Sequence, residues 1–358
     1  MFFTTSPDAL FIPPTTIDPV GFGKVAIVTG CGSGVGLACA QLLLAHQYSV
    51  CGLDTREFNY ALLQEADHGR FHFHRADLTG PKACEDGVYA AVASFGGRID
   101  LLVNVAGVMG SFSSADGVTD SEWDRVVAVN LTVPVKMMRS VIPFMLEKKS
   151  GVIVNVASTA GVSGAVAGIA YTCSKHGLIG ATKNVAWRFR KEGIRCNAVL
   201  PGAIDSRIGK AIAAGHGGDE EFDAEAYAQV EPVHALHAQA SDSTPNITPL
   251  EVAQSVVFLA TDQARTINGY VTCLMLNTDN GRHVWAGVVF QGHRLPPGRI
   301  THHHNTTKMD NKSTKKLGRW LEPYPYVKPA PQFLHHPFNH QATWPQQVCT
   351  IPGRLSFL

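Results

Sequence analysis

Several features are missing from this chain of 358 residues, and each absence excludes a class of protein. Neither sign of charge is in excess, since 30 Lys and Arg stand against 29 Asp and Glu, which gives no electrostatic reason to expect a nucleic acid or an anionic membrane as partner. No apolar run reaches the roughly 18 residues of a spanning helix. The start, Met1 to Pro14, lacks the basic beginning and long apolar region of a signal peptide. We therefore expect a cytoplasmic protein without a membrane partner.

Disulfide-stabilised folds are also not indicated. The chain has 8 cysteines, but they lack the paired spacing of a small disulfide scaffold. Free thiols in a reducing compartment are expected instead. Five of them fall inside expected strands, helices or a glycine-rich turn: Cys31, Cys39, Cys51, Cys173 and Cys196.

A glycine-rich turn between an apolar strand and a helix is the first signal of function. Residues 24–30 form a short run rich in β-branched side chains, residues 30–36 contain four glycines, and residues 37–44 look helical. Glycines in this context let the backbone pass close to a pyrophosphate, whose charge lies at the helix N-terminus. The alternative is a tight turn with no ligand.

An acidic residue follows the next expected strand. Residues 48–53 form that strand and Asp54 ends it, roughly 20 residues past the glycines, where a carboxylate accepts hydrogen bonds from an adenosine ribose and repels a 2′-phosphate. Arg56 could partly offset that repulsion. NAD is therefore the favoured cofactor and NADP stays possible. As an alternative, Asp54 could cap the following helix.

Repeated alternation of strands and helices predicts the fold class. Residues 71–78 and 99–107 read as further strands, so we expect an α/β protein with one doubly wound parallel sheet and helices on both faces. Ligands bind at the carboxyl ends of the strands in such sheets. The candidate residues at these ends are Gly30, Asp54, Asp77, Asn104 and Ser158.

Three residues in the middle of the chain point to acid–base chemistry. Ser158 offers a hydroxyl that can polarise a carbonyl oxygen, Tyr171 a phenol that can carry a proton, and Lys175 a cation four residues later on the same helix face. A free phenol titrates near pH ~10, and a nearby cation lowers that pKa. A Tyr-x-x-x-Lys pair is also common by chance on a helix. The nucleotide-binding pattern upstream favours a catalytic pair over a chance one.

Taken together, these motifs closely resemble the short-chain dehydrogenase/reductase family, from about residue 22 to about residue 270. The resemblance implies a Rossmann-type sheet of about seven strands. The matching pieces are Thr29–Gly36, Asp77, Asn104–Gly107, Asn130, Ser158, Tyr171–Lys175 and Pro201-Gly202.

The resemblance implies a catalytic tetrad of Asn130, Ser158, Tyr171 and Lys175. Tyr171 would be the general acid or base, and Ser158 would hold the substrate oxygen. Lys175 would lower the pKa of the tyrosine and bind the nicotinamide ribose, and Asn130 would keep a water that relays protons. From the residues alone, Asn130 could instead bond backbone at a helix kink and Ser158 could cap the next segment.

The resemblance also implies the cofactor contacts. Val105 departs from the family's second asparagine, and Ser206 stands where threonine is common. The implied contacts are Gly30, Ser33, Gly34, Val35 and Gly36 at the pyrophosphate; Asp54 at the adenosine ribose; Asp77 and Leu78 at the adenine; Asn104, Ala106 and Gly107 at the adjoining ribose; Tyr171 and Lys175; and Pro201, Gly202, Ile204 and Ser206 beside the nicotinamide.

The organisation follows from where the motifs stop. We expect an N-terminal arm over 1–20, a catalytic domain over 21–280 with a lid at about 205–248 that has helical parts, and a low-order extension over 281–358. The extension contains His302-His303-His304, but adjacent histidines cannot all face one ion, so no metal site is expected. Helices at 120–148 and from 171 to about 191 correspond to the pair through which family members form dimers or tetramers.

The favoured function is hydride transfer between a nicotinamide cofactor and a secondary alcohol or ketone. Met109, Phe112 and Val162 near the expected pocket suit an apolar ring system, such as a terpenoid or polyketide of secondary metabolism. One alternative is a redox sensor that binds the dinucleotide without catalysis. Another is a metal- or partner-binding scaffold built on the histidine-rich extension.

Overall fold

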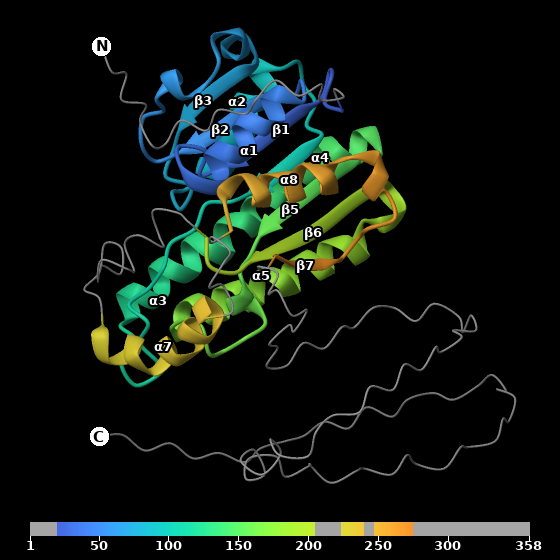
Figure 1. The fold of residues 1–358 in the computed structure, drawn as a ribbon. Helices are drawn as coiled ribbons and strands as arrows, with labels where there is room; N and C mark the ends of the chain where they lie inside the picture. The colour runs from blue at the N-terminus through green and yellow to red at the C-terminus, as the bar shows by residue number, and fades with distance from the viewer. Residues whose placement is uncertain (1–19, 205–222, 240–246, 275–358) are drawn as a thin grey trace, which may run out of the picture. The chain divides into compact units, whose positions relative to one another are not determined.

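The computed structural model describes residues 20–204, 223–239 and 247–274, all within one structural unit, Met1–Gln291. The arm before residue 20, most of the expected lid, Ser206 and the extension lie outside the described residues. Seven parallel strands form one sheet in the order β3-β2-β1-β4-β5-β6-β7 (Figure 1). They are β1 Val25–Thr29, β2 Ser49–Asp54, β3 Phe71–Arg75, β4 Leu101–Asn104, β5 Gly151–Val156, β6 Ile194–Pro201 and β7 Val271–Leu274.

The strand order confirms the expected doubly wound sheet and fixes where a ligand can bind. The chain runs outward from β1 through β2 to β3 and then returns to place β4 on the other side of β1. Crossovers of this kind separate the loops after β1 and β4, which leaves a crevice at the carboxyl ends of these two strands. The glycine-rich turn follows β1, so the sheet places it at the crevice.

Strict alternation along the strands buries both faces of the sheet. Ala26 and Val28 belong to one hydrophobic cluster and Ile27, between them, to another. Helices α1 and α8 cover the first face, and α2, α4 and α5 cover the second (Figure 1). Their bounds are α1 Gly34–Ala45, α2 Ala83–Ser94, α4 Val133–Lys148, α5 Ile169–Arg188 and α8 Pro249–Ala260.

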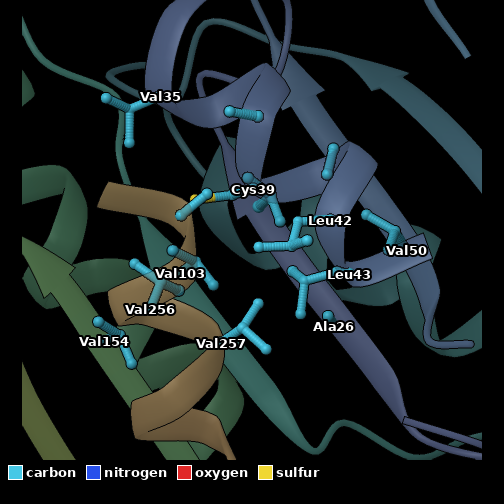
Figure 2. Close-up of a cluster of buried hydrophobic side chains, with 14 of the residues drawn as sticks. Ala26, Val35, Cys39, Leu42, Leu43, Val50, Val103, Val154, Val256 and Val257 are labelled. Carbon is cyan, nitrogen blue, oxygen red and sulfur yellow. The ribbon is translucent and has the colours of Figure 1, made fainter. Parts of the chain in front are cut away.

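Helix α1 packs along α8 (Figure 2). Cys39 and Leu43 of α1 are fully buried against a cluster that includes Val256 and Val257 of α8. Helix α8 begins with a complete capping box between Thr248 and Glu251. The start of α1, which carries the glycine-rich turn, is therefore supported by a helix more than 200 residues later in the chain.

The expected helix over 120–148 is continuous but changes its hydrogen bonding in the middle. It consists of α3 (Asp120–Val127), a π turn (Ala128–Thr132) and α4, and the turn carries the buried Asn130. By length and mean hydropathy, 1.2, this stretch could cross a membrane, which differs from the expectation of no span-length apolar segment. Its Met137 and Met145 are fully buried in the second hydrophobic cluster.

A further helix, α7 (Ala224–Gln239), lies within the region expected to form the lid. Figure 1 shows α7 near α3 and α5. Within the described residues, the remaining helical segments are short 3-10 turns: Tyr60–Leu62, Glu65–Arg70, Thr159–Gly161, Arg190–Glu192 and Asp262–Ala264.

Candidate active site

One cavity of about 890 Å³ opens at the carboxyl ends of the strands, which is within the range of small-molecule and cofactor sites. It joins the nucleotide motifs to the catalytic ones. The sequence-predicted residues that line it are Gly30, Ser33, Gly34, Val35, Gly36, Asp54, Asp77, Leu78, Ala106, Gly107, Ser158, Tyr171, Lys175, Pro201, Gly202 and Ile204.

The glycine-rich turn has the conformation that its sequence requires. Gly30 has φ +69°, and a Cβ there would lie 3.0 Å from the Ala106 Cα. Ser33 begins α1 without a side-chain hydrogen bond to the first-turn amides. Those amides and the positive end of the helix dipole therefore remain available to an anion in the cavity.

Thr29 fixes the turn after β4 against the turn after β1, a role that the sequence analysis did not assign. Its Oγ1 accepts hydrogen bonds from the backbone amides of Val105, at 3.0 Å, and Ala106, at 3.1 Å. The only sequence signal was its place directly before Gly30. Because Thr29 is 1 % exposed, it acts from within the core rather than in the cavity.

Asp54 is held beside the glycine-rich turn by backbone amides. Its Oδ2 accepts from the Gly32 amide at 2.9 Å and its Oδ1 from the Arg56 amide at 3.1 Å. The Arg56 guanidinium reaches Ser33 Oγ at 3.5 Å, so a cation also lies at this end of the cavity. Further along, hydrogen bonds from Thr79 hold the pKa of Asp77 below its usual value, which keeps that carboxylate an acceptor.

Ser158, Tyr171 and Lys175 meet in the same cavity, as the sequence predicted. Ser158 follows β5, and its Oγ accepts from the Ala160 amide at 3.1 Å, so it does cap the next segment as well as facing the cavity. Lys175 is 3 % exposed, and its Nζ donates to the Val156 carbonyl at 3.0 Å and lies 5.5 Å from the Tyr171 ring centre.

Burial sets the proton affinities of these two groups. It raises the pKa of Tyr171 to about 12, against the effect of a hydrogen bond with Ser158, which lowers it. It lowers the pKa of Lys175 to about 8. We expected Lys175 to lower the pKa of Tyr171 below its ordinary value, and the structure differs. Burial raises this pKa more than the hydrogen bond with Ser158 lowers it, and the Lys175 ammonium is turned toward the Val156 carbonyl. At neutral pH, Tyr171 therefore keeps its proton.

Asn130 lies beside the cavity without lining it. Fully buried, it accepts from the Val108 amide and donates to the Val108 carbonyl, both at 2.9 Å, and donates to Ser174 Oγ at 3.2 Å. This is the backbone bonding at a helix irregularity that the sequence left open. A Cβ on Gly107 would lie 3.3 Å from Asn130 Oδ1 and 3.6 Å from Lys175 Nζ, so these two side chains flank one point of the loop after β4.

Asn104 is not brought to the cavity wall. Its Nδ2 donates to Asn155 Oδ1 at 2.8 Å, and Asn155 Nδ2 donates to Thr182 Oγ1 at 2.8 Å. Asn104 Oδ1 is buried and has no hydrogen-bond partner among the described residues. Its expected contact with a ribose therefore stays a prediction, and Asn155, which was not predicted, links β4 and β5 to α5.

Several cavity residues carried no sequence signal. Val166, Ala167, Tyr227 and His234 line the end of the cavity near Tyr171, and the last two come from α7. Of the apolar residues expected there, Met109 lines the cavity, and Phe112 lies behind the wall in contact with Tyr227 and His234. The third, Val162, packs on a separate cluster against β6 and is not part of the lining.

The residues present fit a dinucleotide. Uncapped amides at the start of α1 suit a pyrophosphate, and a carboxylate at the end of β2 suits a ribose. A proton donor, a second hydroxyl and a buried amine lie farther along the same cavity. The fold and the site together define a dinucleotide-dependent oxidoreductase with a doubly wound sheet.

Comparison with known proteins gives the family. Residues 24–217 match the family model described as short chain dehydrogenase. The chain is 48% identical over 247 residues to a short-chain dehydrogenase/reductase, cdmF, of Talaromyces verruculosus, covering 69% of this chain and 93% of the relative. It is 47% identical over 249 residues to asnovolin H dehydrogenase nvfC of Aspergillus novofumigatus, covering 69% and 93%.

A solved structure agrees with these sequence matches. The crystal structure of levodione reductase superposes with a TM-score of 0.61 at 28% identity and covers 71% of this chain and 97% of its own. The chain belongs to the short-chain dehydrogenase/reductase family. It is an oxidoreductase, and membership implies binding of NAD or NADP.

Proposed function

We propose that this protein transfers a hydride between a nicotinamide cofactor and a secondary alcohol or ketone of an apolar metabolite. The observation that carries the proposal is the single cavity that holds the glycine-rich turn and Asp54 at one end and Ser158, Tyr171 and Lys175 at the other. When bound, the nicotinamide supplies the hydride chemistry. The protein supplies position and a proton.

The proton is held on the Tyr171 hydroxyl. With its pKa raised to about 12, Tyr171 is protonated at neutral pH and suits reduction, where the carbonyl oxygen of a substrate takes that proton. Ser158 is the second hydroxyl at this point and orients the same oxygen. Lys175 keeps a positive charge beside the tyrosine below about pH 8, which stabilises negative charge that develops on the phenol oxygen.

NAD is the proposed cofactor rather than NADP. Asp54 has both carboxylate oxygens fixed by backbone amides beside the turn, and a fixed anion there repels a 2′-phosphate. Arg56 near Ser33 works in the opposite direction. The carboxylate is the more rigidly held of the two, since the Arg56 contact is long and exposed.

The proposed substrate is an apolar, ring-bearing metabolite of terpenoid or polyketide type, in secondary metabolism. Met109, Val166 and Ala167 line the end near Tyr171, and Tyr227 and His234 add two rings. The name of one relative states that it acts on asnovolin H, which supports an individual metabolite as substrate.

We further propose a homodimer or homotetramer in the cytoplasm. Exposed apolar side chains on the helix pair α4 and α5, Val135 and Trp187, support association through these helices. All seven cysteines in the described residues are free, which supports a reducing compartment.

The decisive experiment is Tyr171→Phe, assayed by nicotinamide absorbance against a panel of ketones and alcohols with both cofactors. We expect loss of turnover by roughly a hundredfold or more, with cofactor affinity nearly unchanged in a fluorescence titration. The matched control is Tyr89→Phe, the same change at an exposed tyrosine of α2. Turnover that survives in Tyr171→Phe would refute the proton role, and a wild-type protein that binds cofactor but turns over nothing would favour a redox sensor.

A further inference from the structure

Helix α7 closes the substrate end of the cavity through ring contacts. The rings of Tyr227 and His234 are stacked, with centroids 5.9 Å apart and planes at 26°. His234 Nε2 donates to the Val166 carbonyl at 3.0 Å, since a carbonyl can only accept. Both rings line the cavity that contains Tyr171.

Phe112 supports these two rings from behind. It is 3 % exposed, and its ring meets Tyr227 edge-on at 5.1 Å and His234 at 6.4 Å. Its φ of +77° is rare for a bulky side chain, so the surrounding structure must impose it. A Cβ on Gly168 would lie 2.7 Å from the Phe112 carbonyl carbon, and the Ile169 amide donates to the Ser113 carbonyl at 3.0 Å.

A chain of hydrogen bonds joins the same loop to the start of α7. Glu122 is 2 % exposed, and its carboxylate accepts from the Ser111 amide at 2.8 Å and from the Ser111 hydroxyl at 2.7 Å. The Ser113 amide donates to Ser111 Oγ at 3.4 Å, and Ser113 Oγ donates to Asp223 Oδ2 at 3.2 Å. Asp223 Oδ1 in turn accepts from the Ala226 amide at 2.9 Å, in the first turn of α7.

We propose that the Glu122–Ser111–Ser113–Asp223 chain, with the Phe112 ring, anchors α7 so that Tyr227 and His234 form a fixed aromatic wall that selects ring-bearing apolar substrates. Among the described residues, the Glu122 carboxylate accepts hydrogen bonds from the Ser111 amide and hydroxyl, and so holds the loop after β4 against α3. A substrate with two or more rings buries apolar surface on both aromatic side chains, whereas a one-ring ketone such as cyclohexanone can reach Tyr171 without covering the wall.

This selection rests on the proposed function, because it takes Tyr171 as the reacting centre. Ser113 and Asp223 are positioning residues that act through α7. Tyr227 and His234 are the residues that contact the substrate. The anchor and the wall can therefore be tested separately.

The anchor is tested by hydrogen exchange of the α7 amides in the full chain without substrate. In Ser113→Ala, amides of residues 227–235 should exchange roughly fivefold faster, the effect of losing one hydrogen bond, with the strands unchanged. Asp223→Ser should do the same, because serine still caps the helix but is too short to reach Ser113. Ser114→Ala, at the exposed neighbour, is the control. Equal α7 exchange in Ser113→Ala, Asp223→Ser and Ser114→Ala would overturn the anchor.

The wall is tested with two ketones, cyclohexanone and trans-1-decalone. Tyr227→Ala should lower kcat/KM for decalone roughly tenfold and for cyclohexanone less than twofold, mainly through KM. Equal losses of kcat/KM for both ketones, or no loss for either, would contradict the proposed aromatic wall. If the wild type reduces neither ketone, the proposed function is in question, and calorimetric binding of decalone decides the wall instead: affinity equal in wild type and Tyr227→Ala overturns it.

Discussion

Lys175 Nζ lies 5.5 Å from the centre of the Tyr171 ring and donates a 3.0 Å hydrogen bond to the Val156 carbonyl. Two side chains one helical turn apart on α5 thus face the same cavity. The carbonyl of Val156, the last residue of β5, fixes the position of the Lys175 amine. The amine is almost fully buried, and this burial lowers its pKa to about 8. The site therefore holds a charge that the fold itself disfavours.

Removing that charge should stabilise the protein while it inactivates the enzyme. Lys175→Met eliminates a buried ammonium whose pKa falls from 10.5 to about 8, and the free energy of unfolding should rise by about 1–3 kcal/mol at pH 7. The lowered pKa disfavours the folded state fully below pH 8, so the gain should be constant there and should shrink between about pH 8 and 10.5.

Urea unfolding at several pH values measures this gain. The control is Lys183→Met, which changes an exposed lysine of the same helix and should alter stability by less than about 0.5 kcal/mol. A Lys175→Met protein that is less stable than the wild type at pH 7 would mean that the lost bond to Val156 outweighs the burial of charge.

The rate of ketone reduction should fall as pH rises through about 8. Tyr171, with its pKa raised to about 12, keeps its proton over this range, so loss of the Lys175 charge sets the alkaline limb. Arginine stays charged, so Lys175→Arg should move the limb upward by at least one pH unit. Initial rates at saturating cofactor from pH 6 to 10 locate this limb in the wild type and in Lys175→Arg. His176→Gln changes the next residue of α5 and should leave the limb in place; an equal shift in this variant would contradict the assignment of the limb to Lys175.

Asp54→Ala should increase the use of NADP relative to NAD by about tenfold or more, because the fixed carboxylate no longer repels a 2′-phosphate. The measurement is kcat/KM for each cofactor with one ketone. Glu57→Ala is the matched control, since it removes an equal charge three residues later from a side chain outside the cavity lining. An unchanged cofactor ratio in Asp54→Ala would remove this residue from the ribose site.

Gly36→Ala should weaken cofactor binding by tenfold or more and lower stability by about 1–3 kcal/mol. A Cβ there would lie 2.6 Å from the Gly30 carbonyl carbon, so the turn would have to move. Titration of cofactor fluorescence and thermal unfolding report the two effects. Gly69→Ala, where a Cβ meets nothing within 4 Å, should be neutral in both; comparable losses there would show that the assay does not report on the turn.

Local patterns were sufficient for the sheet and for most of the site. The run 24–30 became β1, and the glycine turn adopted its conformation because Gly30 at φ +69° has no side chain to place against Ala106. The spacing of Tyr171 and Lys175 also determined their common direction, since one helical turn separates them. These features depend on neighbours in the sequence.

Features that depend on distant partners were not predictable. Asn104 faces Asn155, 51 residues later, rather than the cavity, and nothing near Asn104 indicates that choice. The positions of Tyr227 and His234 follow from contacts with Phe112 and Val166, more than 60 residues earlier. The pKa of Tyr171 depends on the depth of its burial, which spacing alone does not give.

The packing of α1 on α8 has a consequence for synthesis of the chain. While the ribosome extends the polypeptide, Cys39 and Leu43 emerge long before Val256 and Val257, which cover them in the finished domain. Domains fold as units, and exposed apolar surface invites aggregation until it is covered. A nascent chain that stops short of about residue 260 would therefore expose the apolar face of α1, directly after the glycine-rich turn. We expect chaperones to bind this face until α8 covers it.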